Sequence, residues 1–277
     1  MTGRTPARPC NSLCPTPESG VLRFPPMKTS RLLLFAVAVL LAAPSARAQG
    51  DASSTLDAGR LIVLDRGTPV GYEDFAYERR GDSLLVSGFH TRVVREAEGS
   101  TAKWLKKFTL VVDGTDFGMR AYTSNLEFGG QVTVKGVMPG DTSMTVYSEV
   151  DGAGEAERLV QPPGRLFVMD PMLFTLFDVI CRNVSRQSLA KRPVEMVTLG
   201  EKPATVHATA TAAGPDTIQW GGKRMVSRRY VLSDASNTFL LWASPTGQML
   251  RLVHQGGTLE VLREEPKKGA KAKPKSK

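Results

Sequence analysis

The side chains that most often carry out chemistry in proteins are thinly spread in this chain of 277 residues. Its three histidines, His90, His207 and His254, are isolated, with no second histidine, cysteine or carboxylate at the spacing of a metal site. His207 lies between Val206 and Ala208 in a run that alternates like a strand, where a surface or hydrogen-bonded histidine is the ordinary case. The histidines therefore predict no metal centre.

Several carboxylates lie close to one another in sequence, among them Glu149 and Asp151, and none of these pairs has the pattern of a reactive site. Asp113 and Asp116 flank a glycine in DGTDFG, but the glutamate that completes a calcium loop is missing further on. Glu73 and Asp74 are neighbours in a predicted strand, so their side chains point to opposite faces of the sheet. We therefore expect no calcium binding at the DGTDFG segment and no acid-base catalysis by Glu73 and Asp74.

Motifs for nucleophilic or phosphate chemistry are also missing. No G-x-S-x-G elbow occurs, and Gly221-Gly222-Lys223 joins two short predicted strands, which indicates a hairpin turn and not a phosphate loop. Cys181 ends an apolar segment with no base near it in sequence, which favours a buried packing role. The chain is thus predicted to be non-catalytic and to bind no metal or cofactor.

One apolar segment, DPMLFTLFDVICRNV, is predicted to be a helix. Asp170 is a suitable N-cap and Pro171 suits the first helical position, which predicts a helix over about residues 170–181. Only Thr175 and Asp178 interrupt its apolar surface. Because a helix that is apolar almost all round is buried on most sides, it requires a curved sheet, a hydrophobic partner or a lipid interface around it.

The rest of the domain is predicted to be short β-strands. Apolar or alternating runs rich in Val, Thr, Leu and aromatic residues are bounded by Gly, Pro, Asp and Asn at short intervals. The predicted strands are 60–66, 70–80, 83–95, 104–112, 117–125, 131–137, 142–150, 205–212, 217–220, 225–233, 238–244, 249–254 and 258–263. We therefore predict a mainly β protein with one large curved antiparallel sheet, a half-open barrel of about 11–13 strands around the central helix.

A curled sheet has a concave apolar face that something must fill. The predicted helix is one candidate, and a ligand between helix and sheet is the other. Loops near Met138-Pro139 and at residues 161–166 would then form the rim. The candidate apolar lining of such a site is Met172, Leu173, Phe174, Leu176, Phe177 and Ile180.

The two ends of the chain differ from its middle. Residues 1–26 carry six prolines and no apolar periodicity, which indicates a segment that is not translated or is disordered. Residues 27–48 have the basic start, the apolar run and the small-x-small pattern of a signal peptide cleaved near Ala48. We therefore predict export, to the periplasm or the cell exterior, of a single domain at 49–265 with a disordered lysine-rich tail at 266–277.

The formal charge of +9 belongs to those ends. Residues 1–48 account for +5 and the six lysines of 266–277 for +6, which leaves about −2 on the middle. We therefore expect no nucleic-acid partner. The tail suits a weak contact with anionic membranes, at roughly 1 kcal/mol per lysine, and a solubilising tail without a partner is the alternative. Signal cleavage would leave Cys181 as the single cysteine, so no intramolecular disulfide is expected.

A long antiparallel sheet around a central apolar helix, in an exported chain without disulfides, resembles the lipoprotein-carrier (LolA-like) superfamily and related uncharacterised exported families. The local similarities are RGTPVGYEDFAYER, with its glycine-x-x-valine-glycine turn, and FLLWASPTGQMLRL, in which Trp242 ends one strand, Gly247 lies in the turn and Arg251 follows on the next strand. The resemblance implies transport or sequestration of lipid or acylated molecules across an aqueous compartment.

Two functions thus remain open from the sequence. The favoured one is an exported non-catalytic protein that binds a hydrophobic or lipid-like ligand in the concave face of the sheet. The alternative is a structural or interaction protein of the cell envelope with a fully packed interior. An enzyme with an unrecognised site is a third class, which no group of residues supports, and the oligomeric state is left open.

Overall fold

The computed structural model describes residues 54–95, 101–187 and 189–265. All of them belong to one of two compact units of the chain, residues 50–277. The predicted extension at 1–26, signal peptide at 27–48 and tail at 266–277 lie outside the described residues. Within the described part, no helix combines the length and the apolar character needed to span a membrane.

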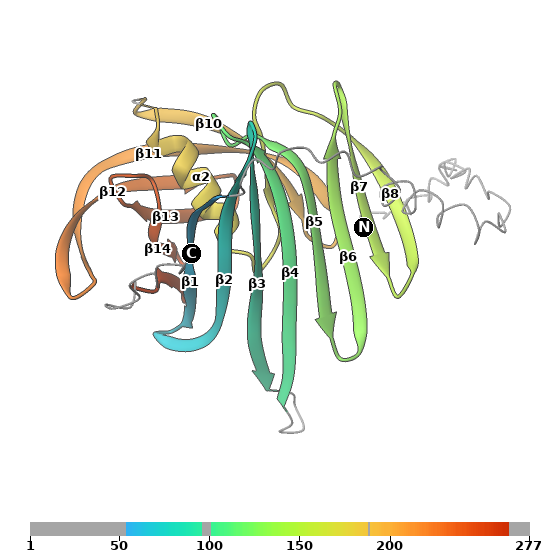
Figure 1. Cartoon of the computed structure of the whole chain (residues 1–277), viewed down its shortest axis with the longest axis horizontal. Helices are drawn as coiled ribbons and strands as arrows, with labels where there is room; N and C mark the ends of the chain where they lie inside the picture. Colours follow the sequence, from blue (N-terminus) through green and yellow to red (C-terminus); the bar gives the residue numbers. More distant parts are fainter. Residues whose placement is uncertain (1–53, 96–100, 188, 266–277) are drawn as a thin grey trace, which may run out of the picture. The chain divides into compact units, whose positions relative to one another are not determined.

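Fifteen strands and one helix make up the described part of the chain (Figure 1). The strands are β1 Ser54–Asp65, β2 Thr68–Arg80, β3 Ser83–Arg95, β4 Thr101–Asp113, β5 Met119–Phe128, β6 Gln131–Pro139, β7 Ser143–Val150, β8 Ala153–Val160, β9 Leu166–Met169, β10 Lys191–Leu199, β11 Pro203–Trp220, β12 Lys223–Ser233, β13 Thr238–Ala243, β14 Met249–His254 and β15 Leu259–Arg263. The helix is α2, Thr175–Ser185.

All fifteen strands form one sheet, in the order β8-β7-β6-β5-β4-β3-β2-β1-β15-β14-β13-β12-β11-β10-β9. Each half is a meander of neighbours in sequence, and the halves join where β1 pairs with β15. Every pair is antiparallel except β9 with β10, which is parallel. The predicted class, a mainly β protein with one large curved sheet and a single inner helix, is confirmed.

The connectivity explains why this sheet curls. Its two edge strands, β8 and β9, follow each other in sequence with only residues 161–165 between them. A flat sheet of 15 strands would hold its edges roughly 65 Å apart, at about 4.8 Å per strand, whereas so short a connection reaches about 20 Å. The edges must therefore approach each other, and the sheet encloses the hollow in which α2 lies (Figure 1).

The predicted number of strands, about 11–13, is too low. β8, β9 and β10 were not predicted, because β8 is exposed on both faces, β9 has four residues, and β10 carries Pro193, a residue that argues against a strand. Two predicted strands, 205–212 and 217–220, are instead one continuous strand, β11. The residues between the two predicted strands, 213–216, belong to β11, which has a bulge between Ala212 and Gly214.

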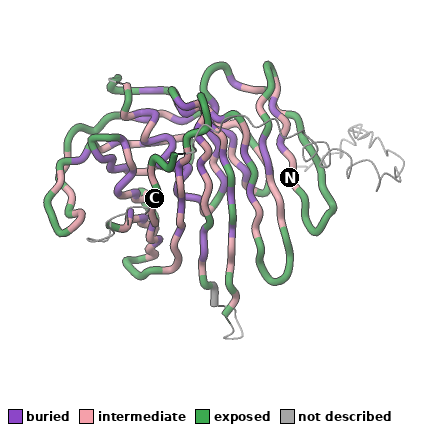
Figure 2. The backbone as a smooth tube through the Cα atoms, in the orientation of Figure 1, coloured by how far each residue is buried: buried purple, intermediate pink, exposed green. Residues whose placement is uncertain are grey.

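The helix is buried as predicted, but it begins later than residue 170. α2 starts at Thr175, with Phe174 in the N-cap position. Asp170 does not cap the helix and Pro171 is not helical, because the backbone turns through a positive φ of 70° at Met172 before the first helical residue. Figure 2 shows buried residues along α2 and on the strand segments around it, and exposed residues at the hairpin ends.

Candidate functional site

An apolar cavity of about 400 Å³ lies beside α2, and we call it the helix cavity. The segment before α2 and the helix itself form one wall, and β10 to β13 with β15 form the other. Its apolar walls include Phe174, Phe177, Met196, Ala208, Leu232 and Phe239. Asp170, Thr198, Asp234 and Asn237 add a few polar groups. Apolar walls with a few placed polar groups are typical of small-molecule sites.

The structure places four of the six predicted lining residues at the helix cavity and two elsewhere. Met172, Leu173, Phe174 and Phe177 line the helix cavity. Leu176 and Ile180 do not line it, because they lie on another side of α2, where they are 1% and 0% exposed in the packed core. The expected rim at Met138-Pro139 and at residues 161–166 is wrong, since these loops do not line the cavity.

A row of polar side chains crosses the concave face of β2 to β6. Cross-strand pairs join Glu73 to His90, His90 to Lys106, and Ser124 to Lys135. Between β4 and β5 the row shifts by two residues, because Lys106 pairs with Leu126 and Ser124 is the next residue of β5 on the same face. We call these five residues the polar ladder. The first four are buried and Lys135 is half-buried. Buried polar groups need partners, and those of the ladder are found mainly in the segments next to the helix cavity.

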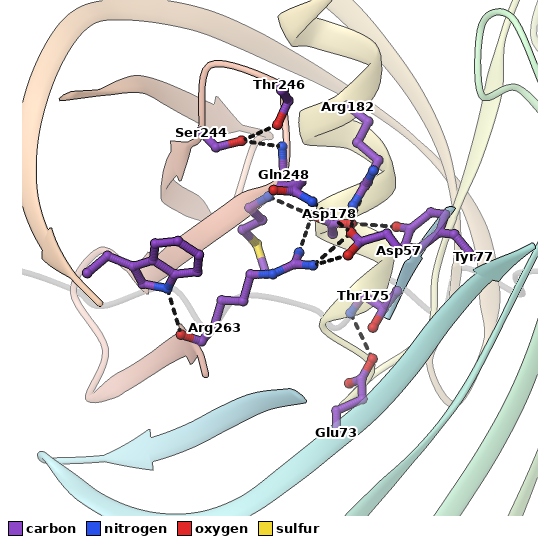
Figure 3. Close-up of polar contacts among 12 residues, drawn as sticks. Asp57, Glu73, Tyr77, Thr175, Asp178, Arg182, Ser244, Thr246, Gln248 and Arg263 are labelled. Atoms are coloured by element: carbon purple, nitrogen blue, oxygen red, sulfur yellow. Dashed lines mark hydrogen bonds and ion pairs between the residues drawn. The ribbon is translucent and has the colours of Figure 1, made fainter. Parts of the chain in front are cut away.

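Glu73 caps the helix from the sheet. Its two carboxylate oxygens accept the backbone N–H groups of Phe174 and Thr175 at 2.7 and 2.8 Å. Figure 3 shows the contact with Thr175. The first N–H groups of a helix have no partner within it, and negative charge is favourable at this end. A strand residue about 100 positions earlier in sequence therefore performs the task predicted for Asp170.

Asp170 instead anchors the segment that leads into α2. Its carboxylate accepts hydrogen bonds from the hydroxyls of Tyr122 and Ser124 at 2.6 and 2.7 Å and forms an ion pair with Lys106. Lys106 also donates to the Pro171 carbonyl at 3.0 Å. Burial lowers the pKa of the Lys106 ammonium, and the attraction of Asp170 opposes that shift. Burial, with the nearby Asp170 charge, raises the pKa of Tyr122 well above its ordinary value.

Lys135 ends the ladder in a second cavity of about 330 Å³, which we call the lysine cavity. The Lys135 ammonium donates to the carbonyls of Leu199 and Gly200, both at 2.8 Å. The cavity is lined by Trp104, Lys106, Ser124, Leu126, Thr133, Lys135, Asp170, Pro171, Leu199, Gly200 and Glu201. Apolar side chains and two ammonium groups thus share one small space.

An ion cluster holds another side of α2. Asp178 accepts the Tyr77 hydroxyl at 2.6 Å and Arg182 Nε at 2.7 Å, and Asp57 accepts Arg263 Nη2 at 2.7 Å and pairs with Arg182 (Figure 3). Burial opposes the charge on Arg182, but Asp178, Tyr77 and Asp57 together outweigh it and raise the pKa of the guanidinium. Two aspartates balance two arginines, so we assign this cluster to holding the helix and not to binding a ligand.

The other residues considered for chemistry have ordinary surroundings. Asp113 pairs with Arg120 and Asp116 with Arg165, while Gly221-Gly222 is the turn between β11 and β12, as predicted. Cys181 is buried, and burial together with the Asp178 charge raises the pKa of its thiol. Among the described residues, no group of three or more His, Cys, Asp or Glu side chains could hold a metal ion.

His90 differs from the isolated residue that the sequence indicates. Its ring is fully buried between Trp104 and Phe174, at centroid distances of 5.7 and 5.8 Å. Its Nδ1 atom lies 3.8 Å from the Glu73 carboxylate, and neither ring nitrogen has a hydrogen-bond partner within the described part. His207, by contrast, is exposed, and its Nδ1 atom lies 2.5 Å from Oε2 of Glu195, as expected of a surface histidine with a partner.

No protein-family model matches the chain, and no curated protein sequence is significantly similar to it. Among solved structures, the chain is similar to a β-barrel-like protein of the domain of unknown function DUF1849 from Brucella abortus. The TM-score is 0.49 and the sequence identity 8%, over 75% of this chain and 95% of that one. The candidate site is therefore defined by the geometry of this chain.

Proposed function

We propose that this chain is a non-catalytic protein that binds a hydrophobic or lipid-like ligand in the helix cavity. The observation that carries the proposal is the helix cavity itself, whose volume of about 400 Å³ lies within the usual range of ligand pockets, roughly 300 to 1,000 Å³. A scaffold with a fully packed interior would fill this space at the density of an ordinary core. The cavity thus favours a binding protein over an envelope scaffold.

A carrier role like that of the LolA-like superfamily is the finer form of this proposal. A curved sheet with an apolar helix in its hollow supports it, since such an arrangement keeps an acyl chain out of water. Export belongs to the same proposal and rests on the predicted signal peptide at residues 27–48. Fractionation of the native host, with detection of the mature N-terminus, tests export, and a full-length chain retained in the cytoplasm would contradict it.

Filling the helix cavity tests the proposal directly. Ala208 is buried on β11 and its side chain lines the cavity, so Ala208→Leu adds apolar volume inside it. A clash of about 1–3 kcal/mol with a bound chain weakens binding by roughly fivefold to 150-fold. The measurement is binding of dodecanol to delipidated protein by calorimetry, together with native mass spectrometry of protein purified from its own host.

Ala204→Leu is the matched control, because Ala204 is exposed on the same strand and does not line the helix cavity. We expect it to bind dodecanol like the unaltered protein. Equal binding by Ala208→Leu and Ala204→Leu would place the ligand elsewhere. Protein that carries no ligand from its host and binds no dodecanol would leave the packed scaffold as the better function.

A further inference from the structure

The helix cavity and the lysine cavity meet at one place in the fold. Both are lined by Asp170, Pro171 and Gly200. A Cβ atom added at Gly200 would meet no atom within 4 Å, so this junction is open on the side of Gly200. A chain molecule in the apolar helix cavity therefore has a short route past Gly200 to the ammonium groups of the ladder.

The two lysines of the lysine cavity differ in how their charge is balanced. Lys106 forms an ion pair with Asp170, which Tyr122 and Ser124 also contact. Lys135 is held only by two neutral carbonyl groups, and none of the ion pairs among the described residues involves it. An ammonium has three donors, and these two hydrogen bonds leave the third free.

The environment increases the effect of that charge on a ligand. Trp104 and Leu126 give the lysine cavity apolar walls, and the side chain of Lys135 is only half-exposed. Attraction between charges is stronger in such a place than in water. Glu201 also lines the cavity, but it is an exposed residue, where solvent screens its charge.

We infer that the ligand is an amphiphile with an anionic head group, whose apolar tail occupies the helix cavity and whose head group lies against Lys135 in the lysine cavity. This inference rests on the proposed function, because it assigns the tail to the same cavity. A carboxylate or a phosphate would accept the free Lys135 donor in a charge-assisted hydrogen bond. An uncharged alcohol of the same length would fill the tail site and gain less at the head.

The test compares three probes on delipidated full-length protein at about pH 8: dodecanoate, dodecanol and inorganic phosphate, each by calorimetry. A hydrogen bond to a charged group corresponds to roughly tenfold or more in affinity. We therefore expect dodecanoate to bind at least about tenfold more tightly than dodecanol, and phosphate without a tail not to bind measurably.

Two variants locate the preference in the structure. Lys135→Gln keeps a donor for the carbonyls but removes the charge, and we expect it to bring dodecanoate affinity down to that of dodecanol while dodecanol binding is kept. We expect the same effect from Gly200→Leu, because the leucine side chain would close the junction between the two cavities. The backbone at Gly200 does not have a positive φ, so leucine should fit there without backbone strain. Lys107→Gln is the control, since Lys107 is exposed and pairs with Glu127.

The outcomes separate this inference from the proposed function. Equal binding of dodecanoate and dodecanol by the unaltered protein would overturn the anionic head group and leave the tail site standing. A preference that persists in Lys135→Gln would overturn the role of Lys135. Binding of phosphate alone, abolished in Lys135→Gln, would show an anion site without a tail. If neither dodecyl probe binds, the proposed function fails as well.

Discussion

Polar side chains on the concave face hold the segments around the helix cavity in place. Glu73, Lys106, Ser124 and Lys135 each contact a backbone segment or a carboxylate next to that cavity. Each contact satisfies a group that would otherwise lose its hydrogen bonds to water on burial. The concave face therefore combines apolar packing with a row of fixed donors and acceptors, which suits a site for a molecule with an apolar and a polar end.

Buried phenols make the protein sensitive to alkaline pH. Burial and the nearby Asp178 charge raise the pKa of Tyr77 well above its ordinary 10.0, and Asp170 acts in the same way on Tyr122. Above about pH 10 the unfolded chain loses these protons while the folded chain keeps them, so the free energy of unfolding falls as the pH rises. Urea unfolding between about pH 8 and pH 11 measures this slope.

The Tyr77→Phe variant isolates one phenol, and we expect it to reduce the alkaline slope. Tyr72→Phe is the control, because Tyr72 lies on the opposite face of β2 under the Arg60 guanidinium. An alkaline slope that is the same in the unaltered protein and in Tyr77→Phe would contradict a contribution from this buried phenol.

Single residues could be predicted from sequence only where local pattern decides their position. The opposite orientation of Glu73 and Asp74 follows from strand geometry and is confirmed, with Glu73 buried and Asp74 paired with Arg60 on the outer face. The polar ladder was not predicted, because it depends on the register between five strands. Register in each hairpin depends on the turn geometry and on the pattern of both strands, and four successive registers must be known before these five side chains can be placed in one row.

At the scale of elements, α2 depends on the sheet for its N-terminus. Its first N–H groups have no side-chain partner from the residues just before it, and Glu73 of β2 supplies both acceptors. The prediction of Asp170 as N-cap failed for this reason: the Asp170 carboxylate is bound by Lys106, Tyr122 and Ser124. Sequence rules for helix ends describe local caps, and this cap comes from a distant strand.

Removing this cap should destabilise the protein. Glu73→Ala leaves two buried N–H groups without acceptors, and we expect the free energy of unfolding to fall by on the order of 3 kcal/mol. Urea unfolding measures the loss, and hydrogen exchange should show faster opening of the first turn of α2. Glu127→Ala is the control, because Glu127 is exposed and pairs with Lys107. If both variants unfold at the same urea concentration, the cap has no stabilising role.

At the scale of the molecule, the order of the strands makes the sheet curl and so forms the hollow in which α2 lies. Consecutive strands are neighbours everywhere except at β8 and β9, the two edges, so hairpin signals in the sequence were enough to predict one mainly antiparallel sheet. The degree of curling depends on β8 and β9, the edges joined by residues 161–165, and neither strand was predicted. The sequence therefore indicates a curved sheet around a helix, but not whether the helix fills it, because that volume results from packing between strands distant in sequence.

Removal of the ligand should weaken the whole molecule, because a ligand bound only by the folded state stabilises that state by mass action. We expect extraction of ligand from protein purified from its own host to lower the free energy of unfolding, by about 2.7 kcal/mol if the ligand had been present at 100 times its Kd. Urea unfolding before and after extraction measures the change, and adding dodecanoate back should restore it. Ala208→Leu is the control, since a filled helix cavity should make its unfolding curve insensitive to extraction. If the urea unfolding curve of the unaltered protein is the same before extraction, after extraction and with added dodecanoate, no ligand in the hollow stabilises the folded protein.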